Sequence, residues 1–145
     1  MNSGTGDLPH DLAAVLRELV LLTRRATAHM AVSSQQLGVL GSLAGGPRRV
    51  SALAEEHGVR TPTMTGMLTR LEQAGAVLRR PDAEDARAVA VELTGHGREL
   101  LARGRAAREE FLARCLDEVD EADREAVRAA LPALARLCAR APQER

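Results

Sequence analysis

The sequence predicts a mainly α-helical protein with one small β-hairpin. Apolar residues recur every three or four positions over most of the 145 residues, which is the period of amphipathic helices. Only residues 76–80 and 88–93 look like strands, and the polar, turn-rich segment between them would join them as a hairpin. A chain of this length can bury enough surface to fold as one domain, residues 1–145, without disulfides or metal.

The first two helices are expected at about residues 10–31 and 34–44. In the first, Leu12, Leu16 and Leu19 belong to an apolar stripe about 20 residues long, more than a small core needs. Part of this helix can therefore pack on another subunit. The second helix begins beside Ser33, a favoured N-cap residue, and ends before a Gly-Gly-Pro sequence.

The next two helices are short and lie close together in the sequence. Ser51 is expected to cap a helix over residues 52–57, which Gly58 closes. Thr61 is expected to cap the following helix, about residues 61–74, with proline at its first position. Two short helices joined by a tight turn that contains glycine form a helix-turn-helix, and a hairpin directly after them makes a winged helix.

Two long helices follow the hairpin. The first begins after Thr94 and carries an apolar stripe to about Val119, and Asp120 can cap the second. The sequence therefore predicts a winged helix-turn-helix at residues 34–94, flanked by helical regions at residues 8–31 and 95–141.

Composition and charge narrow the possible functions. All 20 Lys+Arg residues are arginine, the net charge is zero, and aromatic residues are 1% of the chain, so an RNA site built on stacked rings is nearly excluded. Residues 48–94 hold seven arginines and seven acidic residues, so nucleic-acid binding would need a local basic patch. There is no signal peptide, no apolar run long enough to span a membrane and only two cysteines, so a cytoplasmic protein without membrane contact is expected.

The second helix of a helix-turn-helix lies in the major groove, with its N-terminal end toward the bases. Threonine hydroxyls there can reach phosphates or base edges, and an arginine near a hairpin tip can enter the minor groove, here over a wing at residues 79–91. Asp85 is close enough in sequence to hold the guanidinium of Arg87. The expected DNA-binding residues are Thr61, Thr63, Thr65, Arg70, Arg79, Arg80 and Arg87.

These motifs resemble the MarR family of bacterial transcriptional regulators. The resemblance rests on VSALAEEHGV, on LTRLEQAGAVLRR and on the wing pattern Asp85-Ala86-Arg87, which lies six residues before Leu93-Thr94. It implies a homodimer that reads a pseudo-palindrome in double-stranded DNA and that typically acts as a repressor. The helices at residues 8–31 and 95–141 would then form the dimerisation region, and a small phenolic or anionic effector would control binding.

The resemblance also places an effector crevice near the end of the first helix. The candidate residues there are His29, Met30 and Gln36, and the alternative for each of them is the commoner surface or packing role. Cys115 and Cys138 fall on apolar stripes and are interpreted as buried hydrophobic residues, not as redox sensors.

Two alternatives remain open. The first is a winged-helix dimer that binds a small ligand or a protein partner and has little DNA affinity. Zero net charge favours it, as does Gly66, which stands where family members often carry a basic residue. The second is an enzyme, for which the sequence offers no nucleophile–base pair, no metal ligand set and no phosphate-binding loop, so no catalytic residue, cofactor or metal is expected.

Overall fold

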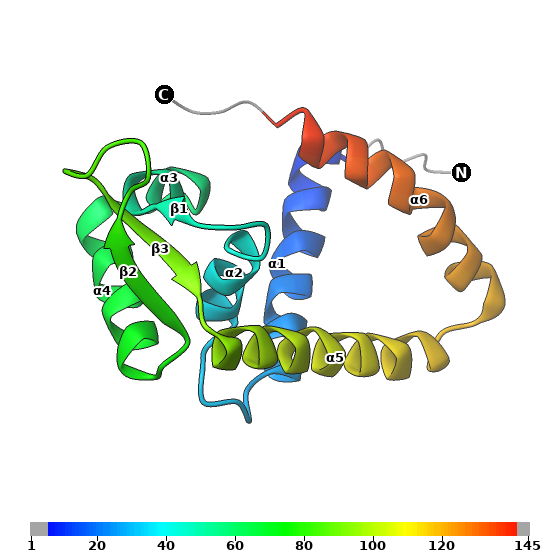
Figure 1. The fold of residues 1–145 in the computed structure, drawn as a ribbon. Helices are drawn as coiled ribbons and strands as arrows, with labels where there is room; N and C mark the ends of the chain where they lie inside the picture. Colours follow the sequence, from blue (N-terminus) through cyan, green and yellow to red (C-terminus); the bar gives the residue numbers. More distant parts are fainter. Residues whose placement is uncertain (1–5, 142–145) are drawn as a thin grey trace. The chain divides into compact units, whose positions relative to one another are not determined.

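The computed structural model describes residues 6–141 and is mainly helical with one small sheet, which confirms the expected fold class (Figure 1). The chain divides into two compact units, residues 1–108 and 109–145, and α5 begins in the first and ends in the second. In chain order the elements are α1 (Leu8–Ala26), α2 (Ser34–Ser42), β1 (Arg48–Arg49), α3 (Val50–Glu56), α4 (Thr61–Gln73), β2 (Val77–Pro81), β3 (Val89–Leu93), α5 (Gly95–Asp117) and α6 (Glu121–Ala139).

Two of the predicted helix caps are confirmed. At α2 the Gln36 amide donates to Ser33 Oγ at 3.1 Å, and Gln36 Oε1 accepts from the Ser33 amide at 2.8 Å, which is a reciprocal capping box. At α6 the Asp123 amide donates to Asp120 Oδ1 at 2.8 Å. Both helices therefore start where local chemistry satisfies their first free amides.

Three helix boundaries differ from the expectation. Helix α1 ends at Ala26 and not near residue 31, because a turn follows in which the Met30 amide donates to the Thr27 carbonyl at 3.0 Å. The caps predicted at Ser51 and Thr61 are wrong, since both residues lie inside helices.

The N-cap residues of α3 and α4 are Arg49 and Arg60. Both have extended backbones, and neither side chain caps its helix by a hydrogen bond. Arg49 is extended because it pairs with Ala90 in the sheet, so α3 can begin only at the next residue.

The sheet has three antiparallel strands in the order β1–β3–β2. The hairpin β2–β3 is as expected, with Arg79 opposite Val91 and Pro81 opposite Val89. The third strand, β1, was not predicted, since two residues carry no strand periodicity of their own. It anchors the hairpin to the start of α3.

The core of the first unit lies between α2, α3, α4, the sheet and the start of α5. Its largest fully buried side chains are Leu37, Leu40, Leu43, Leu53, Met64, Leu68, Leu71, Val39 and Val91. Gly75 ends α4 with φ +73°, a conformation that favours glycine. Gly97 lets α5 pass closely over Ala76, because a β-carbon at Gly97 would overlap the Ala76 carbonyl oxygen.

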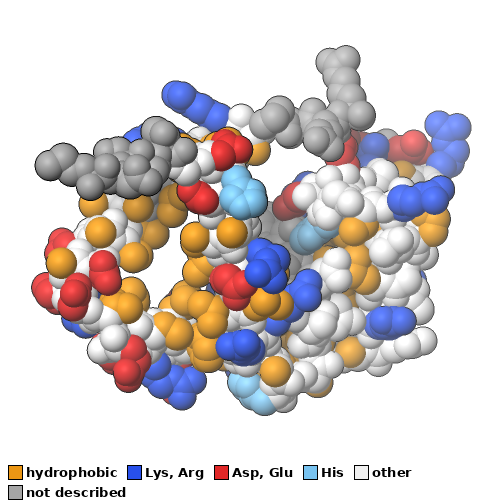
Figure 2. Space-filling model, turned by 180° about the vertical axis from the view of Figure 1, so that it is seen from behind, with side chains coloured by type: hydrophobic (Ala, Val, Ile, Leu, Met, Phe, Trp, Pro, Cys, Tyr) orange, Lys and Arg blue, Asp and Glu red, His pale blue; other side chains and the backbone are white. Residues whose placement is uncertain are grey.

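Large apolar side chains lie exposed on the long helices. In α1, Val15 and Leu16 are 55% and 48% exposed. In the second unit, α6 has no buried residue, and Leu131 and Leu137 are 56% and 52% exposed. Hydrophobic side chains are visible at the surface in the space-filling view (Figure 2). None of the helices between residues 6 and 141 combines the length and hydropathy that a membrane crossing requires.

The two cysteines differ in exposure. Cys115 is half-buried, and Cys138 is exposed on α6, so the expectation that both are buried is wrong for Cys138. The reason is that α6 buries no residue within its own unit.

Candidate nucleic-acid interface

Helices α3 and α4 form the expected helix-turn-helix. The turn depends on Gly58, whose φ of +60° lets its amide donate to the Glu55 carbonyl at 3.1 Å. The Val59 amide then donates to the Ala54 carbonyl at 3.0 Å. These two bonds satisfy carbonyls at the end of α3 and direct the chain into α4.

Helix α4 has one buried and one exposed face. Met64, Leu68 and Leu71 are buried in the core. The predicted DNA-contacting residues Thr63 and Arg70 are exposed and stand seven residues apart, about two turns of helix, so they share one side. Gly66, Gln73 and Pro62 are exposed on the adjoining side, and a β-carbon at Gly66 would meet nothing within 4 Å.

Thr61 and Thr65 lie on a different side of α4, toward the hairpin. With Arg79 they line a hollow of about 470 Å³ that also involves Arg49, Val50, Ser51, Ala88 and Val89. The structure therefore separates the predicted threonines into two groups, one facing outward and one facing the wing.

Arg79 differs from the other predicted arginines, because its guanidinium is bound to α4. Nη1 donates to Glu72 Oε2 at 2.9 Å, and Nη2 donates to the Thr65 carbonyl and to Thr69 Oγ1, each at 3.1 Å. Its side chain is 26% exposed.

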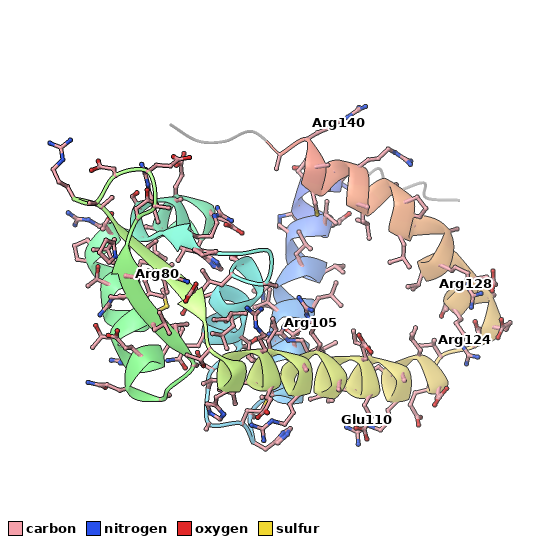
Figure 3. All side chains as sticks on the ribbon, viewed as in Figure 1. Arg80, Arg105, Glu110, Arg124, Arg128 and Arg140 are labelled. Atoms are coloured by element: carbon pink, nitrogen blue, oxygen red, sulfur yellow. The ribbon has the colours of Figure 1, made fainter. Side chains whose placement is uncertain are left out.

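The hairpin carries the two remaining predicted arginines. Arg80, labelled in Figure 3, forms an ion pair with Glu92 of the neighbouring strand and is half exposed. Arg87 lies at the tip, and its side chain is 93% exposed. Asp85 Oδ1 accepts from the Arg87 amide at 3.0 Å and from Arg87 Nε at 3.3 Å, as the sequence spacing predicts.

A second contact that steadies the hairpin was not predicted. Arg49 Nη2 donates to Asp82 Oδ1 at 2.9 Å, and the same oxygen accepts from the Glu84 and Asp85 amides at 2.9 and 3.0 Å. The Arg49 bond, followed by the two amide bonds, lowers the pKa of Asp82 well below its usual range. Asp82 thus ties β1 to the hairpin loop, and only its position at the start of the polar loop could have indicated this.

The arginines of this region are largely paired within the chain. Arg60 and Arg70 have no ion pair within residues 6–141, and Arg60 is exposed at the start of α4. Sequence reasoning missed Arg60, although its place directly before a helix start was a signal, since phosphate is favoured there. The other five of the seven arginines between residues 48 and 94 form the pairs Arg48–Glu56, Arg49–Asp82, Arg79–Glu72, Arg80–Glu92 and Arg87–Asp85.

A polar cluster links α2 to the end of α3. Ser42 Oγ lies 2.8 Å from Glu56 Oε1 and 2.9 Å from His57 Nε2. The Ser42 hydroxyl and the nearby Arg48 lower the pKa of Glu56. Within the described residues no hydrogen bond joins His57 to a carboxylate, so the cluster lacks the base–acid contact of a hydrolytic triad. Its evident effect is to hold α2 against the end of α3.

The effector candidates are only partly brought together. Met30 lines a hollow of about 460 Å³ with Arg24, Thr27, Ala28, Val32, Ser33, Ser34 and Gln35. His29 is exposed beside it and is not a lining residue, and the Gln36 side chain is occupied by the capping box. Within residues 6–141, no group of three or more His, Cys, Asp or Glu side chains could hold a metal ion.

Comparison with known proteins identifies the family. The model of the MarR family matches residues 34–89. The uncharacterized HTH-type transcriptional regulator Mb0904 of Mycobacterium bovis is 33% identical over 136 residues, which cover 93% of this chain and 95% of that protein.

Solved structures share the fold. RV1404 from Mycobacterium tuberculosis has a TM-score of 0.80 at 22% identity, with 99% of this chain and all of that chain covered. A mutant of MepR from S. aureus, bound to an oligodeoxyribonucleotide, has a TM-score of 0.63 at 19% identity, with 89% and 96% covered. The chain therefore belongs to the MarR family of winged helix-turn-helix transcriptional regulators.

Proposed function

We propose that the protein is a homodimeric transcriptional regulator that binds a pseudo-palindromic operator in double-stranded DNA. One observation carries the proposal: α4 exposes Thr63 and Arg70 beside a hairpin whose tip presents Arg87 with a 93% exposed side chain. Such a pair of elements suits the major groove and the adjacent minor groove. The MepR mutant, which has the same fold, was solved bound to an oligodeoxyribonucleotide, and this supports DNA as the partner.

The proposed contacts divide by role. Thr63 and Arg70 face base edges, and Arg87 enters the minor groove while Asp85 holds its guanidinium. The sugar-phosphate backbone of the DNA would be contacted by Thr61, Thr65 and Arg80. Arg60 would add a phosphate contact at the start of α4. Arg79 is treated separately below, because its guanidinium is already bound to α4.

Dimerisation would place two recognition helices on one duplex. The exposed apolar residues of α1 and of the second unit are more than a soluble monomer ordinarily leaves uncovered. In α6, Val127, Leu131 and Leu134 recur at spacings of four and three, so they form one stripe. We propose that a second copy of the chain covers these faces and spaces the half-sites about 10 bp apart.

The proposed effector is a small phenolic or anionic molecule in the hollow beside Met30. Arg24 supplies positive charge at its rim, while Ala28 and Val32 supply apolar wall. Thermal-shift screening with aromatic carboxylates tests this. An increase in Tm that Arg24→Ala abolishes is expected, and no increase with any of them would contradict it.

The internal pairing of five arginines favours a second candidate function. A winged-helix dimer whose basic residues are mostly neutralised within the chain has little charge left for phosphate. Such a protein would bind a ligand or a protein partner and would show no affinity for duplex DNA even at low salt.

The salt dependence of duplex binding distinguishes the two candidates. The wild-type protein is expected to bind a selected duplex with a log–log salt slope whose magnitude falls by about 1.8 in Arg87→Ala, since the substitution removes one cation from each of the two subunits. Thr63→Ala is expected to change sequence preference and leave the slope unchanged. Binding unaffected by both substitutions would contradict the contact assignment, and no binding to any duplex at about 50 mM salt would favour the second candidate.

A further inference from the structure

Of the three arginines on the hairpin, Arg79 alone has hydrogen bonds to α4, the recognition helix of the proposed function, within the described residues. It lies on β2 opposite Val91, and its guanidinium contacts α4 at Thr65, Thr69 and Glu72, which span two turns of the helix. The neighbouring Arg80 pairs within the sheet, and Arg87 pairs within the hairpin loop.

The contacts of Arg79 form a connected network. Thr69 Oγ1 donates to the Thr65 carbonyl at 2.9 Å and accepts from Arg79 Nη2 at 3.1 Å, while Nη1 is paired with the Glu72 carboxylate. A planar guanidinium presents its donors in a fixed fork, so these partners set the direction of the side chain as well as its position. The hairpin strand and α4 are therefore held at one mutual distance and angle.

We propose that Arg79 is a positioning residue that fixes the wing against the recognition helix, and that it does not itself bind phosphate. The inference rests on the proposed function, in which α4 and the wing tip enter adjacent grooves of the same duplex. If their relative position is set before binding, the second contact forms without further ordering cost. Without Arg79, the wing contact through Arg87 would no longer be coupled to the contact through α4.

A double-mutant cycle on the selected duplex tests this coupling, with affinity measured by fluorescence anisotropy at one salt concentration. Arg79→Gln is expected to lower affinity by about tenfold, because the internal charge-assisted bonds that it removes would no longer hold the wing in its DNA-binding position, and one such bond is worth about that factor. In the Arg79→Gln background, the fold-decrease in affinity caused by Arg87→Ala is expected to be less than about a third of the decrease that it causes in the wild type. The reason is that the effects of coupled contacts are not additive.

Arg80→Gln is the matched control, because Arg80 is the adjacent residue, carries the same charge and pairs with Glu92 of the sheet, with no hydrogen bond or ion pair to α4 within the described residues. Its effect and that of Arg87→Ala are expected to multiply, to within about twofold. If Arg79→Gln and Arg87→Ala also multiply, Arg79 acts as an independent charge and the proposal is overturned.

Amide hydrogen exchange in the free protein gives a second readout that needs no DNA. Arg79→Gln is expected to accelerate exchange in the hairpin and along α4, and Arg80→Gln is not. Equal exchange in the two variants would overturn the proposal. A wild-type protein that binds no duplex would contradict the proposed function instead, and the exchange experiment would still decide whether Arg79 holds the two elements together.

Thr69→Val replaces Arg79→Gln if that variant does not fold. It removes one acceptor of Arg79 and changes neither charge nor side-chain shape. It is expected to weaken operator binding and to reduce the effect of Arg87→Ala. Wild-type affinity with a full Arg87→Ala effect would overturn the proposal.

Discussion

Substituting alanine for glycine at two helical positions is predicted to change stability in opposite directions. A β-carbon at Gly66 would meet nothing within 4 Å, because this part of α4 faces solvent. At Gly97, which is buried near the start of α5, a β-carbon would overlap the Ala76 carbonyl oxygen and lie 3.2 Å from Leu93 Cδ2. The Ala76 carbonyl cannot move freely, because it also accepts from the Thr94 amide at 3.1 Å.

The expected magnitudes follow from two opposing terms. Alanine is favoured over glycine inside a helix by about 1 kcal/mol, so Gly66→Ala should raise the free energy of unfolding by up to about that amount. At Gly97 the same gain is opposed by overpacking, which typically costs about 1–3 kcal/mol and more where backbone must shift. Gly97→Ala should therefore lower the free energy of unfolding by about 2 kcal/mol.

Urea unfolding followed by circular dichroism checks both values. Protein concentration must be held constant, since the proposed dimerisation would make apparent stability depend on it. The two midpoints should lie on opposite sides of the wild-type midpoint with an unchanged m-value. Wild-type stability in Gly97→Ala would refute the close approach of α5 to Ala76.

Three further predictions concern other parts of the chain. Ser33→Ala removes one side of the α2 capping box and should lower the free energy of unfolding by about 1 kcal/mol in the same urea assay. Asp82→Ala should speed amide exchange at Glu84 and Asp85 at neutral pH. Because the folded-state pKa of Asp82 is lowered, the stabilisation by its carboxylate is present above the ordinary value of 3.8 and decreases as the pH falls below it, so the wild type and the variant should then converge. Leu131→Glu should convert the proposed dimer to a monomer in sedimentation velocity, and a retained dimer would show that α6 lies outside the interface.

Local chemistry made much of the fold predictable. The capping serine of α2, the capping aspartate of α6 and the Gly58 turn act on residues within a few positions of themselves, so the sequence alone identifies them. The apolar spacing of Met64, Leu68 and Leu71 likewise predicts the buried face of α4.

The features that sequence reasoning missed depend on partners far along the chain. Strand β1 exists because Arg48 and Arg49 pair with Val91 and Ala90, about forty positions later. The same pairing displaced the cap expected at Ser51.

In the candidate site, too, contacts between near neighbours in the sequence were predictable and contacts between distant residues were not. The Asp85–Arg87 contact joins residues two apart and was predictable, whereas Arg49–Asp82 joins residues 33 apart and was not. Sequence reasoning placed Arg79 among the DNA contacts because of its charge and its place on the hairpin. Its partners on α4 lie seven to fourteen residues earlier and become visible only in the folded chain.

Selection from random duplex DNA with the purified protein at about 50 mM salt, repeated near 200 mM, is the decisive measurement, because phosphate contacts change affinity steeply over this range. A dimeric regulator should recover a pseudo-palindrome whose half-sites lie about 10 bp apart. Recovery of no duplex at the lower salt concentration, from protein shown to be free of bound ligand, would contradict the proposed function.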